Sequence, residues 1–167
     1  MVAFAPILGN KPTTLILGSM PSELSLIRNQ YYANPRNCFW WLMSEIFEFD
    51  LACDYHVRSA ALTDFGIAVW DVLHDCERPG SLDSAIVKDS EVVNDFTAFF
   101  HRHADLSRVI FNGAAAETIF KRHFKCLIQD VHKAKPDFEW YRCPSTSPAH
   151  ASMTKQDKLD VWRRCFA

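Results

Sequence analysis

The sequence lacks the signals that mark several classes of protein. Its six cysteines are scattered, and none forms the Cys-x-x-Cys pair that is typical of zinc and iron–sulfur sites, so we expect reduced thiols, no metal and no cofactor. No uncharged stretch reaches the length of a membrane span, and residues 1–12 contain no basic segment followed by a long apolar run. These absences predict a cytoplasmic protein with no membrane partner.

An excess of positive charge is also missing. The 18 Lys and Arg residues and the 20 Asp and Glu residues give a formal net charge of −2, which argues against a generally basic nucleic-acid coat but is compatible with a local basic groove. Repeats, low-complexity tracts and obvious linkers are absent, while 49% of the residues are hydrophobic and 167 residues suffice for one buried core. We therefore expect a single domain over residues 1–167, acting as a monomer.

Short apolar runs alternate with segments of helical spacing along the chain. Strands are predicted at residues 14–17, 65–71, 108–111 and 139–143. Helices are predicted at residues 39–47, 92–103, 114–124 and 155–166, the first of them capped by Asn37. This alternation predicts an α/β fold of three layers, in which a central, mostly parallel sheet is flanked by helices on both faces.

Three of the predicted strands lead directly into small, polar loops. These loops are Gly18–Ser22, Asn112–Gly113 and Cys143–His150. Because the carboxyl ends of parallel strands share one edge of the sheet, where ligands bind, we expect these loops to form one site.

The segment Gln30–Trp40 is dense in aromatic rings and also contains Asn34 and Asn37. Flat rings and amide groups are the components of a pocket that holds a planar base and reads its edge, and Gly18 permits the backbone to approach such a ligand closely. The same residues also fit a second interpretation, in which the rings belong to the core and the asparagines to turns and caps.

The order of these segments resembles the uracil-DNA glycosylase superfamily. Between Leu15 and Ala151 the sequence contains, in order, GSMPS, YYANPRNCFW, FGIAVWD, FNG and CPSTSPAH. It is most similar to the hypoxanthine-DNA glycosylase branch, family 6, and more distantly to the mismatch-specific uracil/thymine glycosylases, which share a PxNxFW segment. The resemblance implies the superfamily's fold and a monofunctional enzyme of base excision repair. Such an enzyme flips a deaminated base (hypoxanthine, uracil or both) out of DNA and hydrolyses its N-glycosidic bond.

The resemblance also implies roles for single residues. Asn37 matches the asparagine of the family's PRNxFW segment and Asp71 lies where relatives contact the base, so both are catalytic candidates. The residues expected to contact the base are Gly18, Ser19, Met20, Phe39 and Asn112. Met20 stands where many relatives carry an Asn or Asp that positions water, and we therefore expect deoxyinosine to be cleaved at least as fast as deoxyuridine. A helix cap for Asn37, a core position for Phe39 and a turn cap for Asp71 are the alternatives.

Residues beside the last polar loop are expected to contact DNA. They are Arg36, Ser145, Thr146, Ser147 and His150. Hydroxyl groups and a guanidinium position a duplex through its phosphates without reading its sequence. Where the uracil enzymes place a histidine that stabilises the base anion, this chain has Cys143.

Three other functions have weaker support. A triad hydrolase of Ser147, His150 and Asp71 lacks the GxSxG elbow, and a cysteine phosphatase would need an arginine where Ala149 stands. A non-catalytic protein that binds damaged DNA would keep the pocket without the water, and Met20 is the residue that favours it.

Overall fold

Four parallel strands form the central sheet of the computed structural model, which describes residues 2–167. In sheet order they are β2 (Ile67–Asp71), β1 (Thr14–Gly18), β5 (Arg108–Asn112) and β6 (Glu139–Cys143). The chain builds the sheet from β1 to β2 on one side and then continues with β5 and β6 on the other, so the strand order reverses beside β1.

Both faces of this sheet are buried, which is why its strands are continuous apolar runs rather than alternating ones. Ile16, Val69 and Ile110 belong to one hydrophobic core, whereas their neighbours Leu17 and Phe111 belong to the other. Successive side chains of a strand point to opposite faces, so a run of apolar residues supplies both cores at once.

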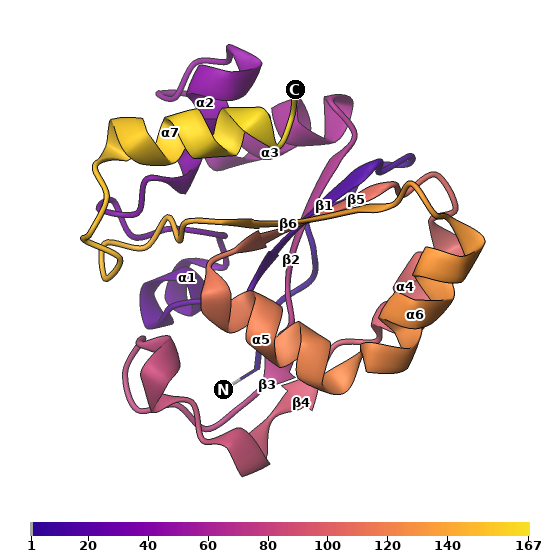
Figure 1. Ribbon diagram of the computed structural model, residues 1–167. Helices are drawn as coiled ribbons and strands as arrows, with labels where there is room; N and C mark the ends of the chain where they lie inside the picture. The colour runs from indigo at the N-terminus through magenta and orange to yellow at the C-terminus, as the bar shows by residue number, and fades with distance from the viewer. Residues whose placement is uncertain (1) are drawn as a thin grey trace.

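Helices cover each face and give the three layers that the sequence predicts (Figure 1). One core contains residues of α2 (Phe39–Phe47), α3 (Tyr55–Asp64) and α7 (Lys155–Arg164). The other contains residues of α4 (Phe96–Arg102), α5 (Ala114–His123) and α6 (Lys125–Ala134). No helix among the described residues is long and apolar enough to cross a membrane.

A smaller unit lies outside the central sheet. It pairs β3 (Leu73–Asp75) antiparallel with β4 (Val92–Val93), and the 3₁₀ turns η1 (Asp83–Ala85) and η2 (Lys88–Ser90) lie between these strands in the sequence. The short helix α1 (Glu23–Arg28) follows β1 and begins at Ser22, whose side chain accepts a hydrogen bond from the Ser25 N–H.

The structure corrects several predicted boundaries. The helix expected from residue 92 begins at Phe96, because Asp95 caps it by accepting from the Ala98 N–H at 2.9 Å and the two valines before it form β4. The strand expected from Phe65 begins at Ile67, because Phe65 ends α3 and Gly66 has a φ of 72°. The sequence prediction also missed α1, α3 and α6. In α3 only Leu62 is buried, so this helix has little apolar periodicity to detect.

Candidate active site

The carboxyl ends of the four strands are level, and a cavity of about 660 Å³ opens there. Gly18 of β1 is paired in register with Asp71 of β2, and Asn112 of β5 is paired with Cys143 of β6. The cavity therefore lies beside the point where the strand order reverses, which is where open α/β sheets bind their ligands. As the sequence predicts, all three polar loops contribute to its lining.

Gly18 is required by the close approach of two polar groups. A Cβ added there would lie 2.3 Å from Oδ1 of Asp71 and 3.1 Å from the hydroxyl of Tyr32. The first distance is far below any normal contact, so only glycine lets the β1 backbone, the carboxyl and the phenol meet at the floor of the cavity.

Asp71 lines the cavity and is 3% exposed. Burial, reinforced by the negative charge of Asp83 and opposed by the positive charge of Arg78, raises the pKa of Asp71 to about 8. Its backbone carbonyl accepts a hydrogen bond from the Asn94 side chain at 2.9 Å, which fixes the end of β2. A carboxyl group in this state is neutral at pH 7 and carries a proton that it can donate.

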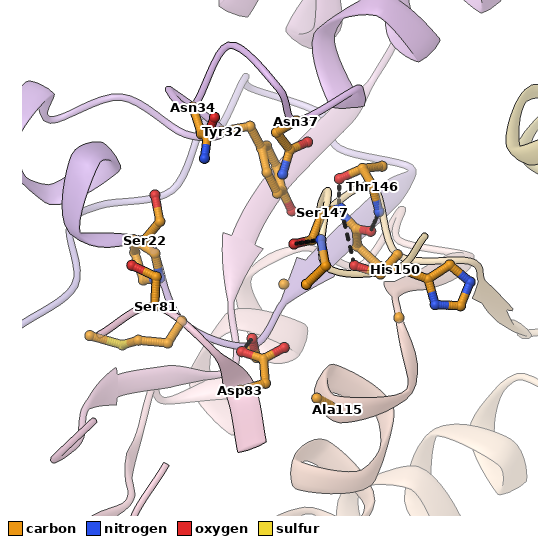
Figure 2. Close-up of a pocket in the computed structure, with 18 of the residues that line it drawn as sticks. Ser22, Tyr32, Asn34, Asn37, Ser81, Asp83, Ala115, Thr146, Ser147 and His150 are labelled. Carbon is orange, nitrogen blue, oxygen red and sulfur yellow. Dashed lines mark hydrogen bonds between the residues drawn. The ribbon is translucent and has the colours of Figure 1, made fainter. Parts of the chain in front are cut away.

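Asn37 also lines the cavity, and its side chain has a fixed orientation. Its Oδ1 accepts from the Phe39 N–H at 2.9 Å, which leaves the amide nitrogen on the cavity side (Figure 2). The N-cap residue of α2 is Cys38 and not Asn37, so the predicted cap is wrong by one position, although Asn37 still satisfies one backbone donor of the first turn. Asn37 can therefore hold the helix and present N–H donors to a ligand at the same time.

Phe39 does not line the cavity, contrary to the prediction that it stacks on a base. It is fully buried, and the ring of Tyr32 covers it with the ring centroids 4.0 Å apart and an interplanar angle of 25°. Tyr31 and Tyr32 line the cavity instead, and Tyr32, which is the ring stacked on Phe39, has a φ of 55° that a sequence pattern does not reveal. Burial raises the pKa of Tyr32, so its hydroxyl stays protonated. Tyr32 is thus the better candidate for contact with a planar base.

Asn112, at the end of β5, and Thr146, in the loop after β6, bind each other by two hydrogen bonds. The Thr146 N–H donates to Oδ1 of Asn112, and Nδ2 of Asn112 donates to the Thr146 hydroxyl, both at 2.9 Å (Figure 2). Thr146 is 1% exposed, and its carbonyl accepts from the Cys38 N–H. The predicted contact of Thr146 with DNA is therefore corrected: its side chain is buried, and its side-chain and backbone hydrogen bonds anchor the last polar loop to the sheet and to the start of α2.

The remaining predicted DNA contacts lie at the cavity wall. Ser147 and His150 are on the last polar loop and Arg36 is on the segment before α2 (Figure 2 shows the first two). The hydroxyl oxygen of Ser145 accepts from the Ser147 N–H, and that of Ser147 accepts from the Ala149 N–H, both at 3.2 Å. These bonds use the oxygen lone pairs and leave each O–H available to donate to a phosphate.

Cys143 does not face the cavity. It is 1% exposed, and its Sγ lies 3.0 Å from Sγ of Cys165 on the α7 side of the sheet. The hydrogen bond with Cys165 and burial both raise the pKa of Cys143. The thiol thus offers no charge to a departing base, unlike the histidine that the resemblance places there.

The sequence prediction missed the loop after β3, which supplies another wall of the cavity. Arg78 is buried and donates to the backbone carbonyls of Met20 and Pro21, while its Nη1 lies 3.9 Å from Oδ1 of Asp83. The same Asp83 oxygen accepts from the Ser19 hydroxyl at 2.6 Å, so Asp83 and Arg78 hold Ser19 and Met20 in place. Asp83 lines the cavity together with Ser81 (Figure 2). The polar stretch beside Pro79 and Gly80 indicates a loop in the sequence. Because β3 lies between β2 and this loop, the loop does not directly follow a strand of the central sheet, and the pattern did not assign it to the site.

The sequence predicts no metal ligands. In residues 2–167 no group of three or more His, Cys, Asp or Glu side chains is placed to hold a metal ion.

Comparison with known proteins adds independent evidence. A protein from Methanosarcina barkeri named hypoxanthine DNA glycosylase is 38% identical over 111 residues, which cover 66% of this chain and 69% of that protein. A second one with the same name, from Methanosarcina acetivorans, is 36% identical over 164 residues, which cover 98% of this chain and 96% of that protein. No family model matches the sequence.

A solved structure has the same architecture. It is the solution NMR structure of a Methanosarcina acetivorans protein described as a candidate uracil DNA glycosylase, and it matches with a TM-score of 0.76 and 28% sequence identity over 99% of this chain and 98% of that one. The sheet, the pocket at its carboxyl edge and the sequence similarity along nearly the whole chain all indicate the same family. The chain belongs to the hypoxanthine DNA glycosylase branch of the uracil-DNA glycosylase superfamily.

Proposed function

We propose that this enzyme flips a deaminated base, hypoxanthine foremost, out of DNA into the cavity and hydrolyses its N-glycosidic bond. The observation that carries the proposal is the set of groups around the cavity: a ring face from Tyr32, amide donors from Asn37, and a neutral carboxyl group from Asp71. A flipped base needs an aromatic or apolar surface to stack on and hydrogen-bonding groups for its edge. The names of the two Methanosarcina relatives support hypoxanthine as the base.

The groups divide the work between binding and catalysis. Tyr32 stacks on the base, with its far face supported by Phe39. Asn37 donates hydrogen bonds where negative charge develops as the base departs, and preorganised donors of this kind act mainly in the transition state. Arg36, Ser145, Ser147 and His150 hold the flanking phosphates, with Gly18, Ser19 and Met20 at the floor of the pocket. The sugar is then attacked by water, and an abasic site remains.

We also propose that the enzyme acts as a monomer in the cytoplasm, as a single domain over residues 1–167. No step of the proposed reaction needs a cofactor, because base release is a hydrolysis.

A single-turnover assay tests the proposal. Enzyme in excess is mixed with duplexes that carry one deoxyinosine, one deoxyuridine or no lesion, and abasic sites are converted to strand breaks with alkali. We expect breaks at deoxyinosine at least as fast as at deoxyuridine, and none in the unmodified duplex. Tight binding to the deoxyinosine duplex without any breaks would instead identify a non-catalytic binder of damaged DNA. Breaks at deoxyuridine alone would contradict the preference for hypoxanthine.

A further inference from the structure

Asp71 has a surplus hydrogen-bonding atom in the interior of the site. It is the last residue of β2, its side chain lines the cavity, and its Oδ2 is buried with no hydrogen-bond partner among the described residues. An unsatisfied buried polar atom in a folded protein calls for an explanation, and a functional role is one of the few available.

Among the described residues, Arg78 is the one cation that acts on Asp71, and it binds other groups. The titratable groups that act on Asp71 are Asp83 of η1 and Arg78 of the preceding loop, and Asp71 in turn acts on Tyr31 and Tyr32 of the segment before α2. Arg78 binds two backbone carbonyls and lies beside Asp83, so it does not form an ion pair with Asp71. Both tyrosines have a raised pKa and stay neutral. The local balance of charge therefore favours the protonated form of Asp71, in agreement with its pKa of about 8.

The two carboxyl groups of the cavity differ in environment, although burial raises the pKa of both. Asp83 is 42% exposed at its side chain, accepts from Ser19 and lies beside Arg78, whereas Asp71 is enclosed and has none of these partners. Paired carboxyl groups in unlike environments commonly divide into an acid and an anion. Here Asp71 is the acid.

A purine leaving group can use such an acid, and a pyrimidine cannot use it in the same way. Hypoxanthine is bonded to the sugar through N9, and N7 in the same five-membered ring carries a lone pair and is the most basic site of the base. Protonation of N7 lets the ring depart as a neutral molecule. Uracil has no such ring and departs through N1.

We propose that Asp71 is the general acid for the departing purine, donating its proton from Oδ2 to N7 as the C1′–N9 bond breaks. This role rests on the proposed function. The electrons of the C1′–N9 bond pass to N9, so the base leaves as neutral hypoxanthine protonated at N7 and the sugar becomes an oxocarbenium ion. Water then adds to C1′, and the proton that it loses returns to the Asp71 carboxylate. The step balances without any oxidant, reductant or metal.

The first arm of the test is a set of single-turnover pH profiles. On deoxyinosine duplex the wild-type rate is expected to be level at low pH and to fall as the pH rises past about 8, as Asp71 loses its proton. Asp71→Asn is expected to release hypoxanthine on the order of 10²- to 10⁴-fold more slowly at neutral pH and to lose this alkaline fall. Its effect on deoxyuridine is expected to be much smaller. Asp89→Asn, on the exposed turn η2, is the matched control.

The second arm uses wild-type protein, so it does not depend on the folding of a variant. A duplex with 7-deaza-2′-deoxyinosine carries C–H in place of N7 and cannot accept the proton there. We expect its base to be released at a rate near that of Asp71→Asn on deoxyinosine, with little further loss when the variant and the analogue are combined.

Each outcome has one meaning. Three results would overturn the acid role while the proposed function stands. They are cleavage of deoxyinosine by Asp71→Asn as fast as by wild type, equal slowing of this variant on deoxyinosine and deoxyuridine, and cleavage of the 7-deaza substrate at the normal rate. A wild-type protein that leaves deoxyinosine intact would overturn the proposed function, and this role with it.

Discussion

The raised pKa of Asp71 predicts a specific dependence of protein stability on pH. In the unfolded chain this carboxyl titrates near 3.8, whereas in the folded protein its pKa is about 8. Between these values the folded state holds one proton more than the unfolded state, so the free energy of unfolding falls as the pH rises. The stabilising contribution of the neutral form is complete below the unfolded pKa and is lost as the pH rises through the folded pKa.

The magnitude follows from the same two values. One pKa unit corresponds to about 1.4 kcal/mol, so ionisation of Asp71 is expected to remove roughly 4 kcal/mol of stability between about pH 5 and pH 8. Asp71→Asn cannot ionise and is expected to lack this loss. The difference in unfolding free energy between wild type and Asp71→Asn should therefore change by this amount in favour of the variant as the pH rises.

Urea unfolding of both proteins at several pH values measures the difference directly. Other titrating groups contribute to both curves and cancel in the comparison, and Asp89→Asn, which alters an exposed carboxyl, should run parallel to wild type. Wild type and Asp71→Asn curves that are parallel across this range would show that Asp71 is ionised in the folded protein throughout, and would refute the reasoning.

Other predictions concern the rest of the site. In a single-turnover assay, Asn37→Ala should slow base release on the order of 10²- to 10³-fold, and it should cost ~1 kcal/mol of stability. Asn37→Asp keeps the acceptor for the Phe39 N–H but loses the donors, so it should restore stability without restoring the rate. Near-normal release by Asn37→Ala would mean that the residue acts only as a helix cap. Gly18→Ala places a Cβ 2.3 Å from Asp71 Oδ1, so urea unfolding should show a loss of about 1–3 kcal/mol together with slower release; unchanged stability would contradict the close approach. Arg36→Ala should weaken binding to every duplex by a similar factor and flatten the salt dependence in fluorescence anisotropy, whereas a loss confined to one lesion would exclude a phosphate contact. Treatment with EDTA should leave the rate unchanged, and a loss that zinc restores would reveal a metal site.

The sequence was sufficient to predict the sheet because its strands are buried on both faces. Continuous apolar runs such as Leu15–Leu17 and Val109–Phe111 have few other interpretations when helices alternate with them. Parallel strands with level ends then bring Gly18, Asp71 and Asn112 to one edge, although they are far apart in the chain. Most of the predicted site followed from this geometry.

The remaining parts of the site depend on features that a sequence pattern does not contain. Tyr32 and Phe39 stack on each other, and a sequence pattern contains neither this contact nor the positive φ of Tyr32. Thr146 belongs to a loop of small polar residues, and its burial results from the two bonds to Asn112 rather than from its own character. The contribution of Asp83 depends on how the segment after β3 folds back toward Ser19.

The central claim is that the cavity at the carboxyl edge of the sheet releases hypoxanthine from DNA. The most direct test is the time course of free hypoxanthine, measured by mass spectrometry, when excess enzyme is mixed with a duplex that carries one deoxyinosine. We predict stoichiometric release of hypoxanthine together with an intact strand that contains one abasic site, at a rate that Asn37→Ala lowers on the order of 10²- to 10³-fold. A duplex that binds the enzyme yet keeps its deoxyinosine would contradict the account.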